Sequence, residues 1–463
     1  MSEENKNQEE LLQKREARRK RRQRNQILAY SVVILLIALA GIGILALIKY
    51  MPNKGSEHQG TSVAKSTPSY SEESPETEPE VTEETESTEE SSSEPEETSS
   101  EPEESQEVVV ELTYEEKLDQ IVDAAIAVMP IEDKVAGLFM ITPELLTGVS
   151  PVTKAGPSTK AAIEKYAVGG ILYRSQNVKD RDTFKTVLEN TANYSKYPLF
   201  LAVEEEGGKA TQLSKANNNT KTSSAKEIAA TGDAQNAYQV GVTIGSYLKE
   251  LGITMDLAPV ADLANIDKSV MADRSYGSDA QTVVGYVKNM MNGLQEQGIT
   301  PCVKHFPGMG SVTTDTEKGR AISERSEEDF WASEMDLFHK LVDDKMPAIM
   351  ISNMAVPALT GDNTPCTLSA KVVTEILRQQ LGYKGLVITD CLNEKAVSEY
   401  YSSEEAAILA LKAGCDMILC PENFEQAYNG VLKAVQEGTI SEERVNDALR
   451  RIYRIKFADR VEE

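Results

Sequence analysis

Eight short apolar runs separated by longer amphipathic stretches constrain the fold of this chain more than any other feature of its sequence. Each run has the length of a buried β-strand, and the stretches between them carry apolar residues at helical spacing. The predicted strands are residues 136–141, 169–173, 199–203, 254–257, 300–303, 348–352, 385–389 and 416–419. The predicted helices include residues 182–194, 234–251, 280–297, 328–342 and 441–460. Strands that alternate with helices in this way predict a parallel sheet covered by helices.

The number of these units favours a closed barrel. Eight strand–helix units in roughly 350 residues fit one (β/α)8 barrel with insertions. A doubly wound open sheet is the competing fold, and the strand count argues against it. We therefore predict that residues 113–463 form a single α/β domain, a (β/α)8 TIM-type barrel.

The N-terminal part predicts a membrane anchor. Residues 1–26 contain a basic cluster from Lys14 to Arg24, and residues 27–49 are almost uninterruptedly apolar. The apolar run has the ~20 residues that a transmembrane helix needs, and it is longer than the apolar core of a cleaved signal peptide. The positive-inside rule places the basic tail in the cytoplasm. We therefore expect a single-pass protein of the cell membrane, with its N-terminus cytoplasmic and its barrel extracellular.

Residues 50–112 differ in composition from both neighbouring regions. Between Glu57 and Glu107 the chain has 18 Glu residues and one Lys, and Ser, Thr and Pro make up most of the remainder. A segment with so few apolar residues cannot offset its chain entropy, so we predict a disordered linker, which its like charges extend. The linker carries most of the formal net charge of −26. The net negative charge of the chain therefore comes mainly from this predicted linker and does not indicate a cationic partner.

Polar or charged residues follow most of the predicted strands. They are Arg174, residues 204–209, Asp256, Lys304, His305, Asn353 and Asp390. Because the carboxyl ends of barrel strands meet at one face, we expect these groups to converge on one pocket rich in carboxylates. Paired carboxylates in such a pocket suggest glycoside chemistry, in which one is the nucleophile and another the acid/base.

Other classes of protein find little support in the sequence. The three histidines, His58, His305 and His339, lack metal-ligand spacing, so we expect no metal. The pair of glycines at 207–208 lacks the Gly-x-Gly-x-x-Gly spacing of a dinucleotide site, so we expect no cofactor. The dense basic patch abuts the predicted membrane helix and does not indicate nucleic-acid binding. Five cysteines without regular spacing argue against a disulfide framework and for small buried side chains.

Five segments occur in an order that resembles glycoside hydrolase family 3, specifically its single-domain β-N-acetylhexosaminidase type. They are AVEEEGGK at 202–209, DLAPVAD at 256–262, RSYG at 274–277, KHFPG at 304–308 and VITD at 387–390. The resemblance spans residues 118 to about 461. It implies a (β/α)8 barrel, a retaining mechanism and removal of terminal β-linked N-acetylglucosamine, usually from cell-wall fragments. The implied partner is thus a carbohydrate, and the sequence predicts no particular oligomeric state.

The resemblance also implies roles for individual residues. Asp390 matches the catalytic nucleophile. Arg274, Lys304 and His305 match residues that hold the sugar hydroxyls and the acetamido group. Glu204 stands where the family usually has a sugar-binding Asp and is one methylene longer.

The loop after the fifth strand departs from the family pattern. Where the family usually has Asp-Ser-His, this chain has Asp315, Thr316 and Glu317. The family's His, paired with the Asp, is the general acid/base, and Glu317 takes its place. A carboxylic acid is the ordinary acid/base of retaining glycosidases, provided that burial or a neighbouring charge raises its pKa. Asp315 is near enough in sequence to act on Glu317 in this way.

Further substitutions leave two functions open. Met309 stands where the family usually has another His, and Lys209 and Gln212 replace two arginines, with loss of the bidentate fork at both positions. One hypothesis is an active hydrolase that uses Asp390 with Glu317. The alternative is a catalytically degenerate homologue that binds wall sugars without cleaving them.

Overall fold

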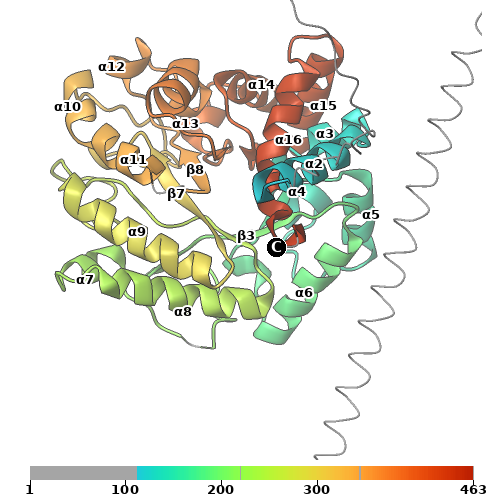
Figure 1. Ribbon diagram of the computed structural model, residues 1–463, viewed down its shortest axis with the longest axis horizontal. Coiled ribbons are helices and arrows are strands. Elements are labelled where there is room, and N and C mark those ends of the chain that lie inside the picture. Colours follow the sequence, from blue (N-terminus) through green and yellow to red (C-terminus); the bar gives the residue numbers. More distant parts are fainter. Residues whose placement is uncertain (1–111, 219, 344–345, 462–463) are drawn as a thin grey trace, which may run out of the picture. The chain divides into compact units, whose positions relative to one another are not determined.

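The computed structural model describes residues 112–218, 220–343 and 346–461. All eight predicted strands are present, and they form one sheet. Helices lie around this sheet (Figure 1). The strands are β1 (Phe139–Ile141), β2 (Gly170–Leu172), β3 (Phe200–Val203), β6 (Met255–Asp256), β7 (Thr300–Phe306), β8 (Ala348–Ile351), β9 (Leu386–Thr389) and β10 (Ile418–Leu419). The predicted anchor, 27–49, and nearly all of the predicted linker, 50–112, lie outside the described residues. Within those described ranges, no helix combines the length and the apolar character of a bilayer span.

The sheet closes into a barrel. Its strand order is β10-β1-β2-β3-β6-β7-β8-β9, and all neighbouring strands in it pair in parallel. A parallel bridge between Ile388 and Met417 joins the two ends of this order, and the Leu392 N–H donates to the carbonyl of Leu419 at 2.9 Å. Strands that follow one another around the barrel in chain order confirm the predicted TIM-type fold and exclude the doubly wound open sheet.

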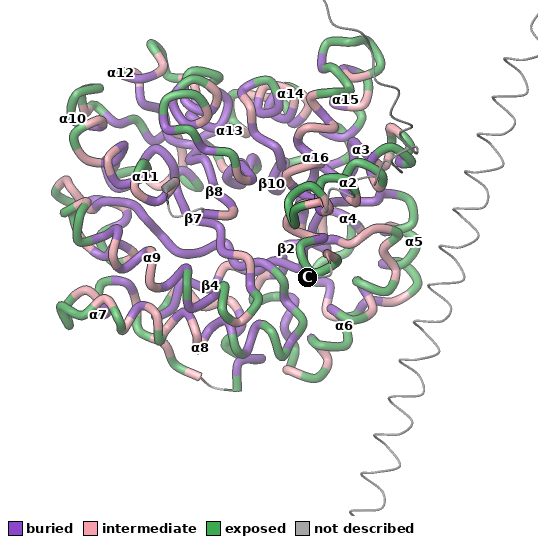
Figure 2. Tube along the Cα trace, viewed as in Figure 1, coloured by how far each residue is buried: buried purple, intermediate pink, exposed green. Residues whose placement is uncertain are grey.

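Helices surround the strands. Figure 2 shows the strands buried at the centre, whereas the surrounding helices expose their outer faces. The helices are α2 (Tyr114–Ala127), α3 (Ile131–Ala136), α4 (Pro143–Thr147), α5 (Pro157–Lys165), α6 (Arg181–Tyr194), α7 (Ala225–Ala229), α8 (Gln235–Leu251), α9 (Ala280–Glu296), α10 (Glu327–Ala332), α11 (Glu334–Asp343), α12 (Pro357–Thr360), η4 (Lys371–Gln380), α13 (Lys395–Ser398), α14 (Ser403–Ala413), α15 (Phe424–Gln436) and α16 (Glu442–Lys456). Apolar residues of both layers fill the space between strands and helices.

Helices α8 and α9 approach each other too closely for side chains at two positions. A Cβ atom at Gly241 would lie 2.4 Å from the carbonyl oxygen of Met290, and one at Gly293 would lie 2.4 Å from that of Tyr238. Glycine is therefore required at both positions. This close packing fixes the helices that lead into β6 and β7, the two neighbouring strands that carry Asp256 and Lys304.

Two local features differ from the sequence prediction. The predicted helix 328–342 is divided into α10 and α11, because Ser333 departs from helical geometry and its hydroxyl donates to the carbonyl of Asp329 at 2.7 Å. An antiparallel hairpin of β4 (Glu205–Gly207) and β5 (Ala210–Thr211) was not predicted. Its sequence is rich in Glu and Gly, which are depleted in strands, so propensity gave no signal for it.

Candidate active site

A cavity of about 480 Å³ lies at the carboxyl ends of the barrel strands. Glu204 reaches it from the end of β3, His305 from β7 and Asp390 from the end of β9. Arg274 and the loop at 315–317 complete one side. The remaining lining residues are Leu172, Arg174, Leu257, Met309, Met350, Cys391, Asn393, Glu394 and Leu419. Six of the seven residues that the sequence assigns to the site therefore line one cavity.

The seventh predicted residue, Lys304, lies behind the cavity wall. Its side chain is fully buried, and its ammonium pairs with Glu204 and with Oε1 of Glu206, the latter at 2.6 Å. Burial disfavours the ammonium, but the two carboxylates outweigh it and raise the pKa of Lys304 above the ordinary value. Lys304 thus positions Glu204, whose side chain is 30% exposed. The carboxylate of Glu204, and not the predicted ammonium of Lys304, therefore lines the cavity.

Arg274 is held in place by Glu206, a residue that the sequence did not assign to the site. Nε and Nη2 of Arg274 donate to Oε2 and Oε1 of Glu206 at 2.8 and 2.5 Å, which is a bidentate pair. Burial opposes ionisation of Glu206, but Lys304 and Arg274 outweigh burial and lower its pKa well below the usual range. The position of Glu206 two residues after Glu204 was the available sequence signal.

His305 is oriented by a second unassigned carboxylate. Its Nδ1 lies 2.6 Å from Oδ2 of Asp262, and Oδ1 of Asp262 accepts the backbone N–H of Met309 at 2.6 Å. Because Asp262 accepts at Nδ1, Nε2 of His305 remains for the cavity. Asp262 also fixes the start of the turn that carries Met309, so the imidazole and this wall of the cavity are positioned together.

Asp390 is a buried carboxylate with 6% of its surface exposed. Its Oδ1 accepts the backbone N–H of Cys391 at 2.8 Å. Burial raises the pKa of Asp390, while His305 and the Cys391 N–H act in the opposite direction. A carboxylate held in this way at the carboxyl end of a barrel strand is suited to nucleophilic attack, because it is positioned and only weakly solvated.

Arg174 and two cysteines lie beside Asp390. Nη2 of Arg174 donates to Sγ of Cys391 at 3.3 Å, and the Cys391 thiol also contacts that of Cys420. The contact with Cys420, together with burial, raises the pKa of the Cys391 thiol well above its ordinary value. All five cysteines are free and buried. Their burial confirms the expectation of small buried side chains.

The loop with the altered acid/base position lies at the rim. Oδ1 of Asp315 accepts the backbone N–H of Glu317 at 3.1 Å, and Oδ2 pairs with Nζ of Lys318 at 3.1 Å. Glu317 is exposed. The carbonyl of Thr316 accepts the N–H of Ala396 at 3.0 Å, which attaches the loop to the start of α13. Asp315 and Glu317 thus both line the cavity, and the carboxylate of Asp315 is paired with a lysine.

Sequence reasoning did not assign Glu394 to the site, although it lines the cavity. Oε2 of Glu394 accepts Nδ2 of Asn353 at 2.9 Å, and the same amide donates to the carbonyl of Cys391 at 2.8 Å. Burial, and then the nearby Asp390 carboxylate, raise the pKa of Glu394 well above its ordinary value. Its place four residues after Asp390, in the same loop, was the signal available in the sequence.

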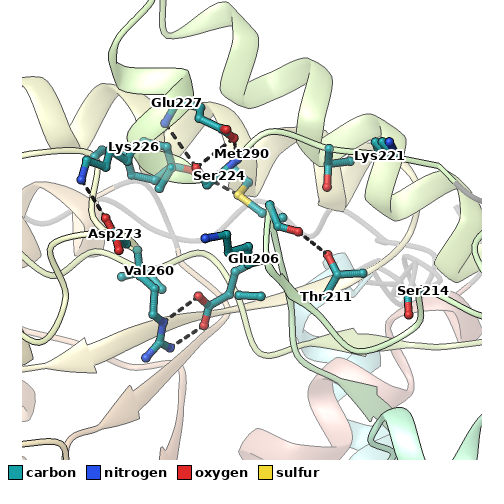
Figure 3. Close-up of a pocket in the computed structure, with 18 of the residues that line it drawn as sticks. Glu206, Thr211, Ser214, Lys221, Ser224, Lys226, Glu227, Val260, Asp273 and Met290 are labelled. Atoms are coloured by element: carbon teal, nitrogen blue, oxygen red, sulfur yellow. Dashed lines mark hydrogen bonds and ion pairs between the residues drawn. The ribbon is translucent and has the colours of Figure 1, made fainter.

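Figure 3 shows a second cavity, of about 830 Å³. Arg274 lines both cavities, so the two adjoin there. Its walls come mainly from the β4–β5 hairpin and the start of α7, and several of its charged groups are already paired. Lys226 Nζ lies 2.7 Å from Oδ1 of Asp273, and Glu227 caps α7 through Ser224. Neither His305 nor Asp390 lines this larger cavity, so the candidate chemistry belongs to the smaller one.

A parallel barrel that presents several carboxylates, a guanidinium and an imidazole around a small cavity at its carboxyl face has the architecture of a glycoside hydrolase. The family model described as the glycosyl hydrolase family 3 N terminal domain matches residues 116–455. The β-hexosaminidase LpqI of Mycobacterium tuberculosis is 33% identical over 301 residues, which are 63% of this chain and 74% of the relative. The chain belongs to glycoside hydrolase family 3 and is a glycosidase of the β-N-acetylhexosaminidase-like type.

Solved structures agree with this assignment. A family 3 β-N-acetylglucosaminidase from Paenibacillus sp. superimposes with a TM-score of 0.67 at 31% identity. The match covers 72% of this chain but 63% of that one, so this chain spans less than two thirds of that protein. The structure of M. tuberculosis LpqI has a TM-score of 0.64 at 29% identity and covers 72% of this chain and 95% of the other.

Proposed function

We propose that this protein is a retaining glycoside hydrolase that removes terminal β-linked N-acetylglucosamine from glycans of the cell-wall type. The observation that carries the proposal is the position of Asp390, a buried carboxylate that shares one cavity with Glu204, Arg274 and His305. Relatives named β-hexosaminidase and β-N-acetylglucosaminidase support the choice of sugar.

In the proposed reaction, Asp390 attacks the anomeric carbon and forms a covalent glycosyl-enzyme, which water then hydrolyses. Glu204, Arg274 and His305 hold the hydroxyl and acetamido groups of the sugar. Their side chains offer an acceptor, the guanidinium N–H groups that Glu206 does not bind, and an imidazole nitrogen, which together match the mixed donors and acceptors of an N-acetylated sugar. The sequence places Glu317 in the acid/base position, with Asp315 beside it.

Turnover of a chromogenic aryl β-N-acetylglucosaminide by the full chain tests this function. We expect the wild type to release the phenol and Asp390→Asn to lose activity by about 10⁴-fold or more. Binding of N-acetylglucosamine without turnover in the wild type would instead favour the alternative, a degenerate homologue that only binds sugar. The absence of the family's His at position 317 is the observation that keeps this alternative in view.

We also propose that residues 27–49 anchor the protein in the cell membrane with the barrel outside the cell. The support is the apolar run behind a basic N-terminal cluster, followed by the acidic segment. Protease treatment of intact cells should release the barrel, whereas the N-terminal tail should stay protected until the membrane is opened. A barrel that resists protease in intact cells but not in permeabilised cells would contradict this topology.

A further inference from the structure

A retaining glycosidase needs two carboxyl groups in different protonation states, one ionised as nucleophile and one protonated as acid. Asp390 takes the first role in the proposed function. The residue that the sequence places in the second role, Glu317, is exposed at the rim. Its neighbour Asp315 is engaged by Lys318 and by the Glu317 backbone N–H. The Glu317 carboxyl group is therefore open to solvent, and its neighbour Asp315 is already bound by other groups of the same loop.

Glu394 lines the same cavity as Asp390 and Glu317, but it is half-buried at the start of α13, whereas Glu317 is exposed. Asn353, a buried residue just beyond β8, donates to Oε2 of Glu394 and so fixes the carboxyl group. A contact with the Thr316 hydroxyl places Glu394 against the acid/base loop, to which α13 is also attached by the hydrogen bond from Ala396.

We propose that Glu394, and not Glu317, is the general acid/base of this enzyme. The inference rests on the proposed function, since it assigns a role within that reaction. It places the missing acid on the loop after β9, beside the loop on which the family carries it. The arrangement makes one loop supply both the nucleophile and the proton donor, while Asn353 holds Glu394 and the loop carbonyl of Cys391 together.

The protonation states agree with this geometry. Burial raises the pKa of both carboxyl groups, but that of Glu394 is raised further because Asp390 stands next to it and is itself favoured as an anion by His305 and the Cys391 N–H. Two close carboxyl groups in a poorly solvated site hold one proton between them. The shared proton therefore belongs on Glu394. The negative charge of Glu317 at the rim also raises the pKa of Glu394. Besides Arg274, the cation Arg174 also lines this cavity, next to Cys391.

The reaction has two steps. A carboxylate oxygen of Asp390 forms a bond to the anomeric carbon while the bond from that carbon to the glycosidic oxygen breaks, and the Glu394 proton moves to the departing oxygen. Glu394, now a carboxylate, takes a proton from water as the water oxygen bonds to the anomeric carbon and the ester to Asp390 breaks. One water is consumed, two sugar fragments are released, and both carboxyl groups return to their initial states.

The test compares leaving groups in the full chain. Glu394→Gln keeps the shape and an acceptor for Asn353 but holds no transferable proton. We expect it to lower kcat/KM for N,N′-diacetylchitobiose, a poor leaving group, by about 10²–10⁴-fold. With the dinitrophenyl glycoside, whose leaving group needs no proton, the glycosyl-enzyme should still form at close to the wild-type rate and accumulate. Added azide should restore turnover of the variant and give the β-glycosyl azide, because azide attacks without a base.

Two control variants and a pH profile complete the experiment. Glu399→Gln removes an exposed carboxylate just after α13 and should behave as the wild type. Glu317→Gln should lower activity less than Glu394→Gln and should not make the rate depend on the leaving group. The wild-type kcat/KM for the disaccharide should fall as the pH rises through the pKa of Glu394, because the acid must be protonated, and this alkaline limb should be absent from Glu394→Gln.

The outcomes separate this inference from the proposed function. If the wild type turns over and requires Asp390, but leaving-group dependence and azide rescue appear in Glu317→Gln and not in Glu394→Gln, then Glu394 is not the acid/base and the hydrolase assignment stands. If the wild type cleaves neither glycoside, the proposed function fails and takes this inference with it. Leaving-group dependence and azide rescue confined to Glu394→Gln support the inference.

Discussion

Oδ2 of Asp262 lies 2.6 Å from Nδ1 of His305, and both groups are buried. The carboxylate thus sets the orientation and the tautomer of an imidazole that lines the cavity, without reaching the cavity itself. Asp262→Asn should keep an acceptor for the Met309 N–H but place an amide N–H against Nδ1 of His305. We expect kcat/KM for an aryl N-acetylglucosaminide to fall by roughly 10- to 100-fold, since a charge-assisted hydrogen bond of about 1.5–3 kcal/mol is lost.

The matched control for this prediction is Asp267→Asn, an exposed residue of the same loop region. It should leave kcat/KM at the wild-type value. Asp262→Asn with wild-type kinetics would show that His305 does not depend on Asp262 for its orientation.

Lys304 is predicted to act on stability as well as on the sugar site. It is fully buried between Glu204 and Glu206. Lys304→Met removes the cation, so the negative charges of two partly or fully buried carboxylates are less well balanced. We therefore expect the free energy of unfolding to fall by about 3–5 kcal/mol in urea titrations. Adding Glu204→Gln to this variant should restore part of the loss, because one of the two carboxylates is then neutral. The exposed Lys249→Met serves as control, and equal stability of the single and double variants would count against the pairing.

The barrel could be predicted from the sequence because each strand is a short apolar run. The composition of such a run is enough to predict that it is a buried strand. The run at 348–352, for example, indicates β8 by itself, since residues 348–351 are apolar and the run is flanked by helical patterns. The hairpin after β3 could not be predicted in this way. Its strands are held by backbone pairing between Glu205 and Thr211, which depends on the turn between them and on the surrounding barrel.

The same limit explains the site. Strand ends converge in any closed barrel, so His305 and Asp390 could be placed together from their positions alone. The direction of a side chain depends on its neighbours in space. Lys304 does not line the cavity because it is buried between Glu204, which does, and Glu206. Glu394 is held at the cavity by Asn353, which follows a different strand, β8.

Glu205 should make stability depend on pH. Burial raises the pKa of this carboxyl group to about 7, and its oxygens accept the Tyr247 hydroxyl at 2.6 Å and the Leu213 N–H at 2.7 Å. Between the ordinary value of 4.5 and about 7, the folded protein binds this proton more tightly than the unfolded chain does. The stabilisation is complete below pH 4.5 and is lost as the pH rises through 7.

Glu205→Gln imitates the protonated group at every pH. Its stability should therefore exceed that of the wild type above neutral pH, by about 3 kcal/mol at most, and should equal it in acid. Urea unfolding across this pH range measures the difference. Asp256 accepts the Glu205 N–H at 2.8 Å and also has a pKa raised by burial. Because Asp256 remains in the variant, the free energy of unfolding of Glu205→Gln should still depend in part on pH. A variant that loses stability equally at all pH values would show that Glu205 is bound as an anion.

Asp416 is predicted to support the fold without taking part in the chemistry. It is fully buried just before β10, at the amino end of the strand. Its Oδ2 accepts Nη2 of Arg378 at 2.6 Å and the N–H of Val387 at 3.0 Å, and its Oδ1 lies 3.1 Å from Nη1 of Arg451 and 3.4 Å from Nη1 of Arg444. Asp416→Asn leaves these cations without their shared carboxylate, so we expect a loss of about 3–5 kcal/mol in the free energy of unfolding.

The comparison of Asp416→Asn with Asp390→Asn separates the two ends of the barrel. Asp416 lies at the amino end, where polar groups serve stability, and Asp390 at the carboxyl end, where they serve chemistry. Asp416→Asn should therefore lower stability while the folded fraction keeps the wild-type KM. Asp390→Asn should lose turnover and keep or gain stability, since burial already disfavours its anion. Asp459→Asn, at an exposed position, is the control for both variants. A raised KM in Asp416→Asn would mean that the arginines around Asp416 affect sugar binding through β10.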